Sequence, residues 1–142
     1  MTVITAAAVA LLLQAAPPAK APAPAATDLP VTVTYKGKGT IDATHRVIVW
    51  LFAEGNITSA SRPLDHQYVT KNGDTVTFKG VSAPVYVFAV YDSSGAYDGV
   101  SGPPPGGLPS ATYRQTPKGP PAAVKAGAAV KFAFDDSEPW NK

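Results

Sequence analysis

The segments RVIVWLF (residues 46–52) and VYVFAVY (residues 85–91) decide the fold class of this chain. Both are rich in β-branched and aromatic residues, which favour β-strands, and both are short for a helix. Both are also apolar at odd and even positions alike, whereas a strand with one solvated face alternates between apolar and polar residues. We therefore expect two central strands whose second face is either buried or forms an apolar surface.

Weaker strand patterns flank these two segments. Alternation of apolar and polar residues predicts strands at residues 31–35, 75–79 and 130–134, and residues 67–70 and 111–115 are expected to form short strands. The sequence KNGD at residues 71–74 contains Asn-Gly, the dipeptide typical of a β-hairpin. The sequence therefore predicts an all-β protein, a single antiparallel β-sandwich of about seven strands.

Composition limits the possible functions. The chain has 142 residues, a formal charge of +2 and no cysteine. Disulfides and thiolate metal sites are excluded, and the charge is too low and too evenly spread for a nucleic-acid surface. The chain is long enough for one domain with some additional sequence.

The N-terminal residues MTVITAAAVALLLQAA have the length and the small-residue end of a signal peptide. Their apolar core is too short to cross a bilayer, so no transmembrane span is expected. The alternative to a signal peptide is that these residues form an Ala-rich disordered leader, or an apolar strand or helix of the domain. We predict a signal peptide at residues 1–16, a Pro/Ala-rich linker at 17–28, the sandwich at 29–137 and a C-terminal tail at 138–142, with a periplasmic or secreted location.

Residues 72–92, NGDTVTFKGVSAPVYVFAVYD, resemble transthyretin-like (prealbumin-like) domains, including the carboxypeptidase regulatory-like ones. Residues 37–52, GKGTIDATHRVIVWLF, are similar to the opening strands of that family. The sequence departs from the family pattern at residues 82–84, which lack the usual glycine, and in a long stretch after Tyr91. The resemblance implies a seven-stranded sandwich of Ig-like or transthyretin-like type and no particular chemistry.

That long stretch, residues 91–114, holds the first candidate site. Asp92, Ser94 and Asp98 are spaced two or four residues apart, as oxygen ligands are in loops that wrap calcium. No downstream Glu completes the ligand set, and Asp, Ser and Gly are also the usual residues of a turn. A calcium site is therefore a hypothesis beside the Asx-turn interpretation, and no other cofactor is predicted.

A second candidate is a binding surface formed by aromatic residues and by three consecutive prolines. Prolines can present a polyproline ridge to a partner, although they also stiffen a long loop. Aromatic side chains on a sheet face can stack on a carbohydrate or close a homodimer. The residues of this predicted surface are Trp50, Tyr86, Phe88, Tyr97, Pro103, Pro104, Pro105 and Tyr113.

Catalytic motifs are weak. His45 and His66 are the only histidines, and both are expected on the solvated surface. The hydroxyisourate hydrolases that share the transthyretin fold end in Tyr-Arg-Gly-Ser, where this chain has Tyr113-Arg114-Gln115-Thr116. The sequence favours a non-catalytic exported binding or interaction module of the cell envelope. It leaves open whether the partner is a protein or a carbohydrate. The alternatives are a calcium-stabilised adhesion-type module and a metal-dependent hydrolase.

Overall fold

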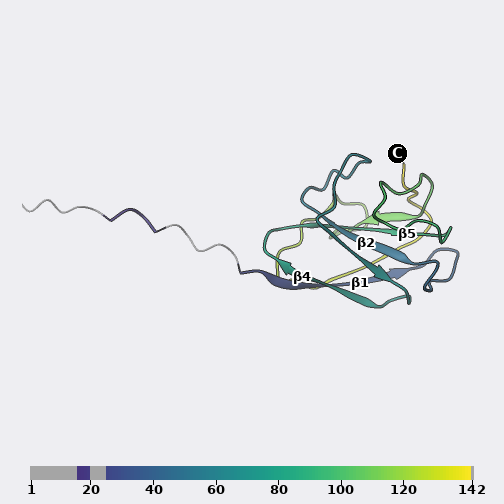
Figure 1. Ribbon diagram of the computed structural model, residues 1–142, viewed down its shortest axis with the longest axis horizontal. Helices are drawn as coiled ribbons and strands as arrows, with labels where there is room; N and C mark the ends of the chain where they lie inside the picture. The colour runs from purple at the N-terminus through teal and green to yellow at the C-terminus, as the bar shows by residue number, and fades with distance from the viewer. Residues whose placement is uncertain (1–15, 20–24, 142) are drawn as a thin grey trace, which may run out of the picture.

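The computed structural model describes residues 16–19 and 25–141 (Figure 1). Within them the chain forms seven strands and no helix, so no helix among these residues could cross a membrane. The strands are β1 (Thr27–Tyr35), β2 (Val47–Phe52), β3 (Asp65–Val69), β4 (Thr75–Val81), β5 (Tyr86–Tyr91), β6 (Ser110–Thr112) and β7 (Val130–Phe134). The predicted signal peptide lies outside the described residues apart from Ala16.

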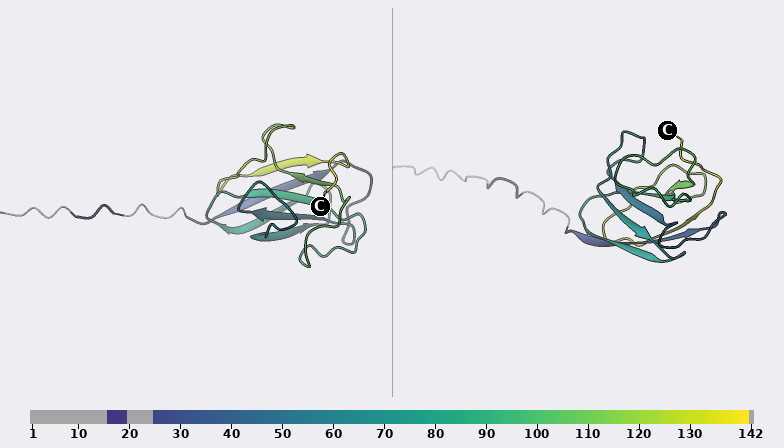
Figure 2. Two further views of the ribbon diagram at one scale, coloured as in Figure 1. Left: turned by 90° about the horizontal axis from the view of Figure 1, so that it is seen from above. Right: turned by 45° about the vertical axis from the view of Figure 1, so that its right-hand side comes forward.

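The strands form two sheets that pack face to face as a β-sandwich (Figures 1 and 2). One sheet has the order β4-β1-β7 and the other the order β3-β2-β5-β6. The predicted all-β class and the number of strands are confirmed. The sandwich begins at Thr27, slightly before the predicted boundary, because β1 pairs with β4 from that residue onward.

One pairing departs from the expected antiparallel arrangement. β1 and β7 run parallel, with Val31 opposite Val130 and Tyr35 opposite Phe134. The segment between β6 and β7 crosses from one sheet to the other, which allows β7 to lie beside β1 in the same direction. Alternation along a strand shows which face is buried, but it carries no information on the direction of the neighbour.

β2 and β5 are the central strands of their sheet, and both of their faces are buried. Val47, Val49 and Leu51 point into the core between the sheets, where they meet Val31 and Phe78 of the opposite sheet. The alternate residues of β2 and β5 form a second cluster on the outer face of the sheet. Burial on both faces explains why these segments show no apolar-polar alternation.

The Asn-Gly turn does not close a hairpin as predicted. It joins β3 to β4, which belong to different sheets. The Asn72 amide instead binds the end of β1, since Oδ1 accepts a bond from the Tyr35 N–H and Nδ2 donates to the Tyr35 carbonyl, both at 2.8 Å. Gly73 has a φ of 83°, as the turn requires, and its N–H donates to the Val33 carbonyl.

The two outer faces of the sandwich differ. The outer face of β4-β1-β7 carries polar side chains such as Thr32, Thr75 and Lys131. The outer face of β2 and β5 is covered by the chain itself, and Figure 1 shows the C-terminus on that side, away from β1 and β4. Among the described residues, the apolar outer face of β2 and β5 is thus covered, and a homodimer through a sheet face stays a prediction.

Candidate ligand-binding site

The outer face of β2 and β5 carries a row of aromatic rings. Trp50 stacks on Phe88 with 5.8 Å between ring centroids, and Phe88 contacts Trp140 at 5.3 Å. Phe52 meets the edge of Phe88 at 6.2 Å. These offset and edge-on arrangements are the favourable ones for aromatic pairs, so the row is a rigid floor on the sheet.

Residues 92–109, the long loop, begin in a turn organised by one carboxylate. Asp92 is fully buried, and its Oδ1 accepts bonds from the Ser94 N–H, the Ser94 hydroxyl and the Gly95 N–H. Its Oδ2 accepts a bond from the Tyr97 N–H at 2.9 Å. This is an Asx turn extended by a fourth donor, and it holds the chain in a tight curve after β5.

A second turn of the same kind follows at Asp98. Its carboxylate accepts bonds from the backbone N–H groups of Val100 and Ser101 and from the Ser101 hydroxyl. These bonds lower the pKa of Asp98 to about 2, because they favour the ionised form. Each of the two carboxylates thus stabilises the turn that directly follows it.

This geometry bears on the calcium hypothesis. The Asp92 carboxylate already accepts four hydrogen bonds, three at Oδ1 and one at Oδ2, so a cation held by both oxygens would compete with these donors. Among the described residues, no group of three or more His, Cys, Asp or Glu side chains could hold a metal. A calcium site at Asp92, Ser94 and Asp98 therefore stays a prediction.

Two side-chain bonds fasten the long loop to the sheet, and a third lies within the loop. The Trp50 indole Nε1 donates to the Gly99 carbonyl at 3.0 Å, in a buried position. The Tyr68 hydroxyl donates to the Asp98 carbonyl at 2.6 Å, and the Tyr97 hydroxyl donates to the Gly102 carbonyl at the same distance. The loop is therefore a fixed wall that rises beside the aromatic floor.

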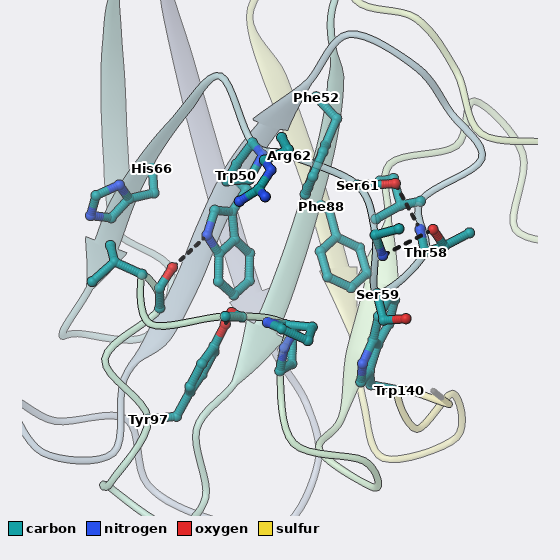
Figure 3. Close-up of a pocket in the computed structure, with 18 residues that line it drawn as sticks. Trp50, Phe52, Thr58, Ser59, Ser61, Arg62, His66, Phe88, Tyr97 and Trp140 are labelled. Carbon is teal, nitrogen blue, oxygen red and sulfur yellow. Dashed lines mark hydrogen bonds between the residues drawn. The ribbon is translucent and has the colours of Figure 1, made fainter.

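Residues 53–64, the short loop, form the opposite wall. Within it the Ser61 hydroxyl accepts a bond from the Thr58 N–H, and the Thr58 hydroxyl accepts one from the Ala60 N–H (Figure 3). A backbone bond from the Ser61 N–H to the Thr58 carbonyl closes the same turn. The hydroxyl residues thus hold the loop in shape.

The C-terminal segment, residues 135–141, closes the end of the floor. Trp140 pairs with the long loop through two backbone bonds, one from its N–H to the Leu108 carbonyl and one from the Gly107 N–H to its carbonyl. Only 7% of Trp140 is exposed, so this residue of the predicted C-terminal tail belongs to the outer cluster. Its indole Nε1 is buried and has no hydrogen-bond partner among the described residues.

These elements enclose a pocket of about 460 Å³ (Figure 3). Trp50, Phe52, Phe88 and Trp140 form its floor, and Tyr97, Gly99 and the prolines at 103 and 104 line the side of the long loop. Thr58, Ser59, Ser61 and Arg62 line the side of the short loop. The two large apolar side chains most exposed to solvent, Leu64 and Val100 at 61% each, lie one in each loop.

Arg62 and His66 are the ionisable side chains other than Tyr97 that line the pocket, and the lining includes no carboxylate. Burial, with the neighbouring Asp98 charge as a smaller cause, raises the pKa of Tyr97 to about 12. Tyr97 is therefore neutral at physiological pH. The pocket combines an apolar floor with hydroxyl groups and one guanidinium group.

The predicted binding residues separate into two groups. Trp50, Phe88, Tyr97, Pro103 and Pro104 line the pocket. The remaining three, Tyr86, Pro105 and Tyr113, do not: Tyr86 lies beside Gly55, Pro105 is exposed, and Tyr113 packs against Phe132. Pro104 is buried and Pro103 and Pro105 are exposed, and a polyproline ridge for a partner stays a prediction.

Sequence reasoning missed two parts of the site. Trp140 follows a run of acidic and polar residues that resembles a solvated tail, and Arg62 lies in a segment without strand pattern. The sequence predicts both histidines on the solvated surface, and both are half-buried; His66 lines the pocket, whereas His45 lies near Asp42 in a turn outside it. The Trp in an otherwise polar C-terminus was the available signal, since a large aromatic residue usually finds a place to pack.

Comparison of this chain with protein-family models, with curated proteins and with solved structures gives no match. The resemblance to transthyretin-like domains thus rests on the sequence motifs alone.

Proposed function

We propose that this protein is an exported, non-catalytic binding module that holds a small molecule with an apolar ring system between its two loops. The observation that carries the proposal is the pocket of about 460 Å³ with an aromatic floor. Sites for small organic ligands have volumes of about 300 to 1,000 Å³, apolar linings and a few polar groups at defined places. The transthyretin-like resemblance and the N-terminal leader pattern support the fold type and the export that the proposal includes.

The chemistry of the lining favours binding over catalysis. A hydrolase needs a nucleophile or an activated water beside a general base. The lining offers one imidazole, His66, and no carboxylate to orient it or to share a metal with it. The hydroxyls of Thr58 and Ser61 already accept hydrogen bonds that shape the short loop.

The floor also favours a flat apolar ligand over a carbohydrate. The floor consists of Trp50, Phe52, Phe88 and Trp140, whose side chains offer no hydrogen-bond acceptor to a sugar hydroxyl. A sugar buried in the pocket would need several acceptors for its hydroxyl groups, because unpaired buried polar groups are costly. The absence of carboxylates from the lining leaves few such acceptors.

The two tryptophans of the chain provide a specific assay, since both Trp50 and Trp140 lie in the pocket floor. A set of small ring compounds is titrated into ¹⁵N-labelled protein while the two indole N–H signals are followed by NMR. We expect saturable shifts of both indole signals for fused-ring compounds. If no compound moves either signal at millimolar concentration, the proposed function is wrong.

A matched pair of variants locates the binding. Ala60 is exposed and lines the pocket, so Ala60→Trp should fill its mouth and abolish the shifts. Ala83 is exposed in the connection between β4 and β5, and Ala83→Trp should leave binding unchanged. Binding that survives Ala60→Trp with unchanged affinity would place the ligand elsewhere.

A further inference from the structure

We infer that the pocket selects molecules that carry an anionic group beside their ring system, and that Arg62 is the residue that recognises the anion. The inference rests on the proposed function and narrows it to a ligand class, aromatic or other ring-bearing carboxylates and related organic anions. Three observations carry it: the position of Arg62, the lack of a partner for its guanidinium, and the lack of negative charge in the lining.

Arg62 is placed to meet a bound ring. It lies near the end of the short loop and lines the same pocket as Trp50 and His66. In Figure 3 its side chain extends toward Trp50, at the opposite end of the floor from Trp140. A ring held in the pocket between the two loops would thus present a substituent to Arg62 at the Trp50 end.

The guanidinium is available for a ligand. Within the described part of the chain, close pairs of basic and acidic side chains join Arg114 to Glu138, Lys79 to Asp28 and His45 to Asp42, and none engages Arg62. No hydrogen bond to Arg62 occurs in that part either. A guanidinium presents donors in a planar fork that matches a carboxylate with two parallel bonds.

The lining of the pocket carries positive but no negative charge. No carboxylate lines the pocket, so a bound anion would meet no repulsion from the wall. The nearest acids of the long loop, Asp92 and Asp98, direct their oxygens to their own turns. An ammonium group in the same place would face the Arg62 charge, so a cationic ring compound should be rejected.

Three compounds with the same ring test this directly: 2-naphthoate, 2-naphthamide and 2-naphthylmethylamine, which are anionic, neutral and cationic at neutral pH. At low ionic strength we expect naphthoate to bind about tenfold more tightly than naphthamide, as one charge-assisted bidentate contact provides. The amine should bind more weakly than the amide. Salt should weaken naphthoate binding and leave naphthamide binding almost unchanged.

Arg62→Gln should reduce the affinity for naphthoate to that for naphthamide and leave the affinity for naphthamide unchanged. Lys118→Gln is the control, because Lys118 is exposed outside the pocket and its loss changes the net charge by the same amount. Melting curves of the variants check that both are folded.

The outcomes separate the two proposals. Equal binding of the anion and the amide, or naphthoate selectivity that persists in Arg62→Gln, overturns the anion inference and leaves the binding pocket intact. Equal loss in Lys118→Gln would attribute the selectivity to overall charge and would also overturn it. Failure of all three compounds to bind would overturn the proposed function together with the inference.

Discussion

Replacement of Asp92 by alanine tests how the long loop is held against the sheet. The Asp92 carboxylate is fully buried and accepts four hydrogen bonds, from the N–H groups of Ser94, Gly95 and Tyr97 and from the Ser94 hydroxyl. The alanine side chain removes all four at once. Since the turn follows β5 directly, the loss acts on the whole wall of the pocket.

The magnitude follows from which donors water can reach. A hydrogen bond to a charged acceptor contributes about 1.5–3 kcal/mol, and a buried donor left unpaired costs about 1–3 kcal/mol. Ser94 is exposed, so water can replace its bonds, whereas Gly95 and Tyr97 are half-buried. Two poorly compensated donors give a loss of about 3 kcal/mol in the free energy of unfolding, or about 10 °C in melting temperature for a domain of this size.

Asp92→Asn is the graded variant. Its Oδ1 can still accept three of the four bonds, but an NH₂ group would face the Tyr97 N–H that Oδ2 now accepts. We expect a loss of about 1–2 kcal/mol, from one broken bond and the opposition of two donors. Asp98→Ala, which removes a more exposed turn carboxylate, is the control and should cost less than either Asp92 variant.

Thermal unfolding followed by circular dichroism, in EDTA and in millimolar calcium, measures these losses. We expect the order Asp92→Ala, Asp92→Asn, Asp98→Ala from largest to smallest, and the same melting temperatures in both buffers. A calcium-dependent rise in the melting temperature of the unmodified protein that disappears in Asp92→Ala would refute the Asx-turn argument. A loss in Asp92→Ala no larger than that in Asp98→Ala would refute it as well.

Three other predictions follow from single contacts. Gly99→Ala should lower the free energy of unfolding, measured by chemical denaturation, by about 1–3 kcal/mol. Gly99 has a φ of 83°, and a Cβ at this position would lie 2.9 Å from Ile48 Cγ2. An unchanged free energy of unfolding would contradict this close approach. Asn72→Ala should cost about 1–3 kcal/mol in the same assay, since it leaves the Tyr35 backbone groups at the end of β1 unpaired, whereas Lys71→Ala beside it should be nearly neutral. The pKa of Tyr97 is raised to about 12, against 10.0 for a free tyrosine, so the contribution of the neutral hydroxyl to stability is complete below pH 10 and is lost as the pH rises toward 12. Tyr97→Phe should therefore flatten the fall in melting temperature between pH 10 and 12. An unchanged slope would count against the burial of the hydroxyl.

Much of the sandwich could be predicted because local patterns and burial agree. β2 and β5 are apolar at every position, and each of their residues is buried except the half-buried Tyr86 at the start of β5. The Asn-Gly turn shows where such reasoning ends. Its dipeptide favours a tight turn locally, but the bonds from Asn72 to β1 are long-range contacts, and β3 and β4, which the turn joins, belong to different sheets.

The pocket could be predicted only in part, for a related physical reason. The apolar outer residues of β2 and β5 require a cover, and the long loop supplies it where Trp50 and Tyr68 bind its backbone carbonyls. A cover made of loops leaves space wherever two loops meet without interlocking, and the size of that space depends on turns such as those at Asp92 and Thr58. The long loop is therefore not an appendage of the sandwich. It replaces the solvent over the second face of the sheet, and the pocket is the part of that face that neither loop fills.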